Sequence, residues 1–180
     1  MKKFQFLLLD AGPIIKLFEL DIWDKFIKCC DVTISRIIAE DQALYIEDGT
    51  KQINLRLYEE LVEIIDVDVS VVKSFYDKYN LLGKYDIHDG EKETLAFLCS
   101  SPQKWHVCSA DHVVFQVLGW LNKADQGISL EEIFKDTGLR PVSDWKNLTP
   151  KDKYWKYTKK FREKWTQKGQ QDFVQDQVFS

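Results

Sequence analysis

The sequence FQFLLLDAGP, residues 4–13, decides the fold class of this chain. Residues 4–9 form a short apolar run without a helical period, which is typical of a buried strand. Asp10 and Gly12 interrupt that run, and proline is favoured in the first turn of a helix. We therefore predict a strand over residues 4–9, a turn at Asp10 and a helix that begins near Pro13.

Short strands and helices alternate along the rest of the chain. Residues 32–35 and 105–110 predict further strands, while residues 57–65 fit either a helix or a passage from helix to strand. We expect the other helices at 21–27 with Asp21 as N-cap, 36–41, 71–79, 91–99, 111–121, 129–134 and from Thr149 onward. This alternation favours βαβ units and therefore an α/β fold with a parallel sheet.

The composition is that of a globular protein. The chain has 180 residues, of which 44% are hydrophobic and 30% charged, a balance that excludes disordered and fibrous proteins. No apolar run approaches the roughly 18 residues of a membrane span, and the run after the N-terminal lysines is too short for a signal peptide. The four cysteines form no CxxC pair, so we expect reduced thiols and a cytoplasmic protein without membrane contact.

The formal net charge of −4 hides an asymmetry. Residues 1–150 carry 17 Lys or Arg and 25 acids, whereas residues 151–168 carry eight and two. Aromatic residues alternate with these basic ones, which fits a helix packed on the body by its aromatic side chains or a surface that follows RNA phosphates. We predict one domain over residues 1–145 and a basic, aromatic helical extension with a tail over 146–180.

Acidic residues occur where the predicted strands end or the next helices begin. Asp10 and Asp111 follow strands, Glu91 opens a helix, and Glu40 lies early in the helix after the second strand. In parallel sheets, ligands bind beyond the carboxyl ends of the strands, so these acids are expected to converge there.

Carboxylates that converge must be neutralised. Each close pair costs on the order of 4 kcal/mol at an effective dielectric constant near 20. Protons or cations remove that cost, and Mg²⁺ and Mn²⁺ prefer such oxygen ligands. Acids that hold these ions are what phosphodiester hydrolysis requires.

These residues resemble the PIN-domain family, metal-dependent ribonucleases found among toxin–antitoxin toxins and RNA-processing nucleases. The resemblance covers roughly residues 1–145, and its motifs are LLLDAGPII (7–15), ISRIIAE (34–40), DGEKETLA (89–96) and CSADH (108–112). It implies a parallel sheet flanked by helices on both faces. It also implies a catalytic and metal-holding set for Mg²⁺ or Mn²⁺, namely Asp10, Glu40, Glu91 and Asp111, with the Ser109 hydroxyl helping to orient the site.

This chain departs from the PIN-domain pattern at one position. The resemblance also implies several partners. Many members carry Asp where this chain has Glu91, although one branch shares its Gly-Glu-x-Glu helix start. The implied substrate is RNA; a toxin would also have an antitoxin protein as partner, and the family suggests a homodimer. The alternative is a PIN-like module that binds RNA or protein without catalysis. A haloacid-dehalogenase-type phosphatase is disfavoured, because it needs a second Asp where Gly12 stands.

Each candidate acid also has a purely structural interpretation. Asp10 and Asp111 suit helix N-caps, Glu91 suits a helix N-terminus, and Glu40 suits a solvated helix face. Other nearby residues compete for the same roles: Asp41 for that of Glu40, Asp89 for that of Glu91, and Glu93 for a second metal. The three histidines, His88, His106 and His112, form no zinc motif such as HExxH.

Overall fold

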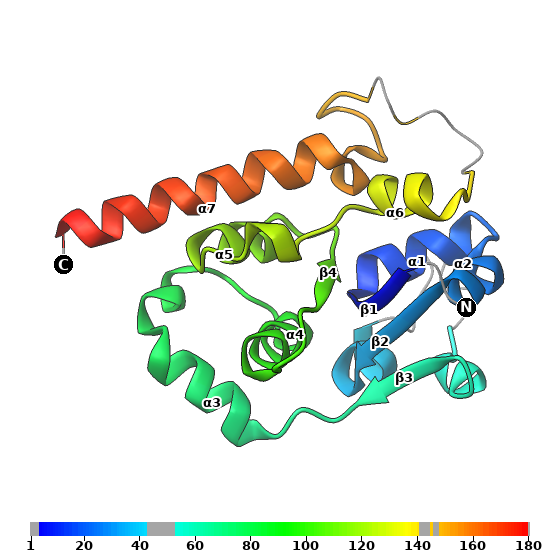
Figure 1. The fold of residues 1–180 in the computed structure, drawn as a ribbon, viewed down its shortest axis with the longest axis horizontal. Coiled ribbons are helices and arrows are strands. Elements are labelled where there is room, and N and C mark those ends of the chain that lie inside the picture. Colours follow the sequence, from blue (N-terminus) through cyan, green and yellow to red (C-terminus); the bar gives the residue numbers. More distant parts are fainter. Residues whose placement is uncertain (1–3, 43–52, 141–144, 146–147, 180) are drawn as a thin grey trace.

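The computed structural model describes residues 4–42, 53–140, 145 and 148–179, which form an α/β fold (Figure 1). Its strands are β1 (Phe4–Leu9), β2 (Cys30–Ser35), β3 (Val62–Ile65) and β4 (His106–Cys108). They pair in the order β3-β2-β1-β4, and every pairing is parallel. The prediction of an α/β fold on a parallel sheet is confirmed.

Helices cover both faces of this sheet (Figure 1). The α-helices are α1 (Ala11–Glu19), α2 (Trp23–Cys29), α3 (Val69–Lys78), α4 (Asp89–Ser100), α5 (His112–Trp120), α6 (Leu130–Thr137) and α7 (Lys159–Phe179). Because side chains alternate along a strand, Leu7 and Leu9 of β1 enter a core with α1, α2 and α6. Leu8 enters the opposite core with α3, α4 and α5.

The strand order creates a crevice between β1 and β4. From β1 the chain moves outward to β2 and β3, and it then crosses back to place β4 on the other side of β1. Ligand sites of parallel sheets form at such a switch point, outside the carboxyl ends of the strands. The backbone N–H of Asp10 donates to the carbonyl of Cys108 at 3.0 Å, which holds these two strand ends together.

The C-terminal helix α7 packs along α5, as Figure 1 shows. The two backbones approach most closely at Gly119 and Gly169, where an added Cβ would overlap a carbonyl oxygen of the facing helix. Buried Asp172 of α7 accepts hydrogen bonds from Tyr85 Oη at 2.9 Å and Gln116 Nε2 at 2.7 Å. Although α7 has 21 residues, neither it nor any other described helix combines the length and apolarity needed to cross a membrane.

Several expected boundaries are wrong or are now resolved. The last helix begins at Lys159 rather than Thr149, because Asp152 closes a turn back onto Thr149 and Thr158 accepts from the N–H of Phe161 instead. Asp21 does not cap α2; it adopts φ 54°, a left-handed conformation that Asp tolerates in a turn.

The stretch that could not be assigned, residues 57–65, ends as a strand. Within the helix expected over 36–41 the structure has a π-helix over Ile38–Gln42, and 3₁₀ helices occur over Leu55–Tyr58, Asn80–Lys84, Ala124–Gln126 and Trp155–Tyr157. The dipeptide Asp48-Gly49, which is typical of a turn, lies outside the described residues.

Candidate functional site

A pocket of about 260 Å³ opens at the crevice between β1 and β4. The start of α1 forms one side, and the starts of α4 and α5 form others. A residue of the C-terminal segment completes the lining, which consists of Asp10, Ala11, Gly12, His88, Glu91, Ala110, Asp111 and Lys156. Three of the four predicted carboxylates therefore line one pocket.

Asp10 is almost completely buried, with 6% of its surface exposed. Its Oδ1 accepts a hydrogen bond from the N–H of Ala11 at 2.8 Å and thereby caps α1. Burial raises the pKa of the Asp10 carboxyl above its ordinary value, and the charge of Asp111 raises it further, while the hydrogen bonds from Ser109 and Ala11 act in the opposite direction.

Ser109 links Asp10 to Asp111. Its buried hydroxyl donates to Asp10 Oδ2 at 2.5 Å and accepts from the backbone N–H of Asp111 at 2.9 Å. Asp111 Oδ1 in turn accepts from the N–H of Val113 at 2.9 Å and caps α5. The loop after β4 therefore places the two aspartates relative to each other through one serine.

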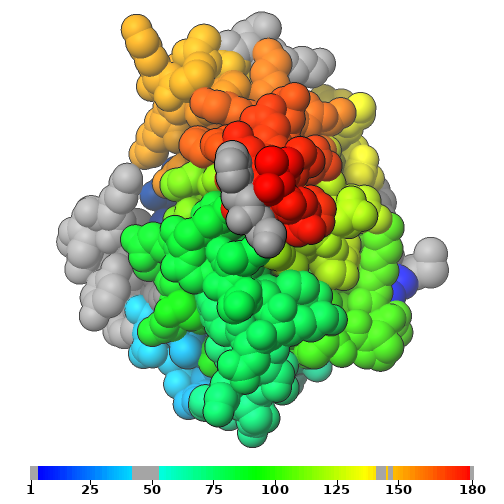
Figure 2. All heavy atoms as spheres, turned by 90° about the vertical axis from the view of Figure 1, so that its left-hand side faces the viewer, coloured from blue at the N-terminus to red at the C-terminus, as the bar shows by residue number. Residues whose placement is uncertain are grey.

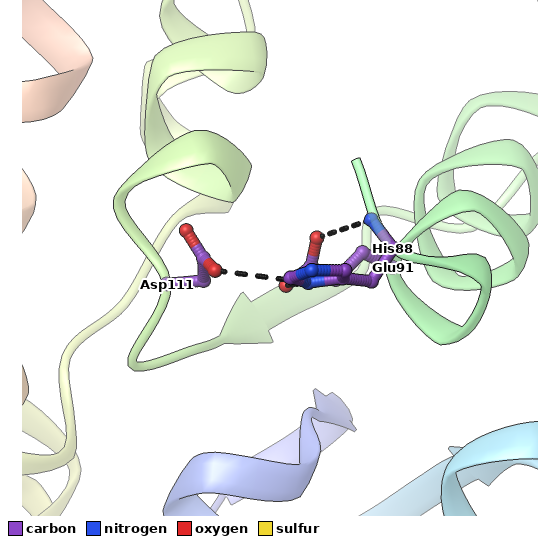
Figure 3. A group of neighbouring side chains, drawn as sticks. All are labelled: His88, Glu91 and Asp111. Carbon is purple, nitrogen blue, oxygen red and sulfur yellow. Dashed lines mark hydrogen bonds and ion pairs between the residues drawn. The ribbon is translucent and has the colours of Figure 1, made fainter. Parts of the chain in front are cut away.

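Glu91 and His88 come from the start of α4, and Figure 3 shows both side chains directed toward Asp111. Glu91 is 5% exposed, and its Oε2 accepts from the backbone N–H of His88 at 3.0 Å. The imidazole Nδ1 of His88 lies 3.7 Å from Glu91 Oε1 and 4.0 Å from Asp111 Oδ2. Burial, and then the charges of Asp10 and Asp111, raise the pKa of Glu91 to about 7.

His88, Glu91 and Asp111 offer one nitrogen and two oxygen ligands that lie within 4.8 Å of one another. Sequence reasoning missed His88 because it looked for a histidine-rich zinc motif. The available signal was its position three residues before Glu91, which places both side chains on one side of a helix start.

Gly12 explains how α1 and the β4–α5 loop come so close at this pocket. A Cβ on Gly12 would lie 2.7 Å from the Cβ of Ala110, nearer than two carbon atoms can approach. Only glycine therefore allows the start of α1 to lie against the loop that carries Ser109 and Asp111.

The predicted convergence does not extend to Glu40. The short π-helix that carries it turns its carboxylate toward Arg56, with which it forms an ion pair, and Arg36 Nη1 lies 3.8 Å away. Glu40 is not among the residues that line the pocket.

The competing acids also lie outside the pocket lining. Asp41 is exposed, and Asp89 forms an ion pair with Lys92 at 2.8 Å. Glu93 is buried near β2, where it contacts the Ser35 hydroxyl and the backbone of Ile37.

Comparisons of the chain with models of protein families, with curated proteins and with solved structures find no match. The chemistry of the pocket itself is therefore the basis for a function.

Proposed function

We propose that this chain is a metal-dependent endoribonuclease of the PIN type, which hydrolyses phosphodiester bonds of single-stranded RNA. One observation carries the proposal: Asp10, Glu91 and Asp111, which are distant in the sequence, line one pocket at the switch point of a parallel sheet. Carboxylates crowded in this way need a cation or protons between them. The resemblance of their order along the chain to PIN domains supports the same function, and with it an antitoxin or a second copy as partner.

The donor set is chemically suited to a divalent metal. His88, Glu91 and Asp111 would hold the ion, and Asp10 would contribute from the same pocket. Mg²⁺ takes oxygen ligands, whereas an imidazole nitrogen favours a transition metal, so we expect Mn²⁺ to be preferred. When bound, such an ion supplies an acidic water and neutralises charge on the attacking and leaving oxygens.

The side chains themselves orient the site and handle protons. Ser109 holds Asp10 and the backbone of Asp111 in place. The N–H of Val113 occupies Asp111 Oδ1, so Oδ2 is left on the side of His88. Glu91 Oε2 is occupied by the His88 N–H, so Oε1 is the atom that would bind the ion. In the pocket without metal the pKa of Glu91 is about 7, so at neutral pH this oxygen would give up a proton as the ion binds.

The test is cleavage of labelled single-stranded RNA with Mn²⁺ or Mg²⁺. We expect Asp10→Asn to lower the rate by at least about 100-fold, because it removes a charged group that helps to hold the metal, and EDTA to abolish the rate, because it removes the metal itself. Asp89→Asn is the matched control, since Asp89 lies near Glu91 but pairs with Lys92 outside the pocket. Cleavage that persists unchanged in EDTA or in Asp10→Asn would overturn the proposal.

A second candidate, a PIN-like module that binds RNA or protein without catalysis, is favoured by one observation. Glu40, which resembles the second PIN acid, is engaged by Arg56 and Arg36 instead of facing the pocket. Calorimetric titration with Mn²⁺ separates the two functions: heat that disappears in Asp111→Asn supports the nuclease, and no heat at millimolar metal supports the binding module.

A further inference from the structure

Lys156 brings a positive charge to the acidic pocket from the far end of the chain. It lies in the 3₁₀ turn Trp155–Tyr157 and lines the pocket together with Asp10, Glu91 and Asp111. Among the described residues, no carboxylate lies within ion-pair distance of its ammonium group, which lies over the Tyr157 ring at 5.6 Å. The charge of Lys156 is therefore available to a bound molecule.

The segment that carries Lys156 is anchored to the body. Tyr157 is 3% exposed, and its hydroxyl donates to the carbonyl of Gly12, itself a pocket residue, at 3.4 Å. Buried Lys16 of α1 lies under the rings of Tyr154 and Tyr157, 4.9 and 5.6 Å from their centroids. Lys156 is thus held at the pocket by packing on both sides of it.

Some of the basic residues after Lys156 form ion pairs and others do not. Arg162 forms a two-point ion pair with Glu132 at 2.7 and 2.8 Å, and Lys168 pairs with Asp172. These pairs fasten α7 to the body or stay within it, so they are not available to a partner.

From residue 156 onward, the lysines without an ion pair among the described residues are Lys156, Lys160 and Lys164. Lys160 and Lys164 lie one helical turn apart on α7 and are both exposed. Figure 2, which looks onto the C-terminal end of α7, shows the C-terminal segment, in orange and red, on the upper part of the molecule. Lys160 and Lys164 therefore present two exposed positive charges on α7, in the same C-terminal segment that brings Lys156 to the pocket.

An aromatic pair lies beside these lysines, since Lys164 Nζ is 5.1 Å from the centroid of the Trp165 ring. Trp165 is half-buried, and its ring lies 4.4 Å, centroid to centroid, from that of His112. His112 Nδ1 lies 3.2 Å from Asp111 Oδ1, so the aromatic pair adjoins the acids of the pocket. Lysines that contact phosphates beside aromatic rings that stack on bases are the features of single-strand binding surfaces.

We propose that the C-terminal segment forms the RNA-binding side of the pocket and that Lys156 binds a phosphate of single-stranded RNA next to the acids. The choice of RNA as ligand rests on the proposed nuclease function. An otherwise negative pocket repels phosphates, and an unpaired lysine at its edge offsets that repulsion where the chain must approach.

The experiment measures binding of a fluorescent oligouridylate by anisotropy at several salt concentrations, in the full chain with Asp10→Asn present to prevent cleavage. Each phosphate contact to single-stranded RNA contributes about 0.7 to the slope of log K against log salt. We expect Lys156→Ala to weaken binding and lower the slope by about 0.7, and Lys156→Arg to restore both. Lys25→Ala is the control, because exposed Lys25 lies on α2 and does not line the pocket.

The outcomes separate this inference from the proposed function. An unchanged slope and affinity in Lys156→Ala, or no binding of RNA by the chain at all, would overturn the role of Lys156. A slope that depends on Lys156, in a chain whose wild type cleaves no RNA with Mn²⁺, would support the RNA contact and reject the nuclease. Cleavage by the wild type together with an unchanged slope would support the nuclease alone.

Discussion

Asp10, Glu91 and Asp111 each serve as a helix cap and as a pocket acid. A carboxylate has two oxygens, and in each of these residues one oxygen accepts a backbone N–H at a helix start. The other oxygen remains for Ser109 or for the pocket. The structural and the functional interpretation of these acids are therefore compatible, because the cap occupies only half of each side chain.

Glu91 provides a test of the crowding of charges in the pocket. Its pKa is about 7 in the folded protein against 4.5 ordinarily, so the folded state binds more protons than the unfolded state between these values. Protonation of Glu91 therefore stabilises the folded state fully below pH 4.5, and this stabilisation is lost as the pH rises through about 7. Without metal, we expect Glu91→Gln to remove up to about 2 kcal/mol of this pH dependence, after allowance for solvent screening in the open pocket.

The measurement is urea denaturation in EDTA between about pH 4 and pH 8. Glu60→Gln is the control, since Glu60 is exposed and removal of its charge should leave the pH dependence of the wild type intact. Parallel curves for the wild type and Glu91→Gln would show that the charges do not repel as the geometry implies.

At the scale of elements, β1 and β4 matter most because their carboxyl ends carry the acids. Both follow from apolar sequence runs, and the loop after β4 needs only three residues to present Ser109 and Asp111. The helix expected over 36–41 contains a short π-helical turn over Ile38–Gln42, and its Glu40 pairs with Arg56 outside the pocket.

The contact between α5 and α7 depends on two glycines. An alanine Cβ at Gly119 or Gly169 would overlap the carbonyl oxygen of Thr166 or Gln116 respectively. A helix backbone cannot move aside as a flexible side chain can. We therefore expect Gly119→Ala or Gly169→Ala to lower the free energy of unfolding by about 2–3 kcal/mol or more. Chemical denaturation measures this loss.

Gly83→Ala is the matched control for these substitutions. A Cβ at Gly83 would meet no atom within 4 Å, so the change in unfolding free energy should stay within roughly 0.5 kcal/mol. Equal effects at Gly83 and Gly119 would indicate a general helix-propensity effect rather than close packing of α5 on α7.

At the scale of the whole molecule, the C-terminal segment belongs to the body. Tyr157 is part of the core that contains α1 and α6, and Phe161 is part of the core that contains α5. Glu131 and Glu132 at the start of α6 also bind the start of α7, through the N–H of Lys159 and through Arg162. One segment thus joins the two sides of the sheet.

Truncation tests whether residues 1–145, the domain that the sequence predicts, fold without the C-terminal segment. A chain that ends at residue 148 would expose the α5 surface under α7 and leave Gln116 without its buried partner Asp172. We expect it to lose cooperative unfolding, or at least about 3 kcal/mol of stability. Near-ultraviolet circular dichroism during urea unfolding measures both, and a deletion of residues 178–180 is the control. An unchanged midpoint in the shorter chain would establish an independent domain.

The sequence by itself determined the alternation of strands and helices, the parallel sheet and the candidacy of Asp10, Glu91, Asp111 and Ser109. These depend on local signals: apolar runs, capping residues and the rule that parallel strands end at one edge. The same signals predicted a long final helix but misplaced its start at Thr149, because the turn closed by Asp152 competes with helix initiation there.

Only the tertiary structure decided which side chains share the pocket. Glu40 leaves it because Arg56 and Arg36 attract its carboxylate, while His88 joins it because the start of α4 faces Asp111. Lys156 reaches the pocket because Tyr157 packs against α1. The pairing of Glu40 with Arg56 and the packing of Tyr157 on α1 join residues distant in the chain, which no local pattern of sequence encodes.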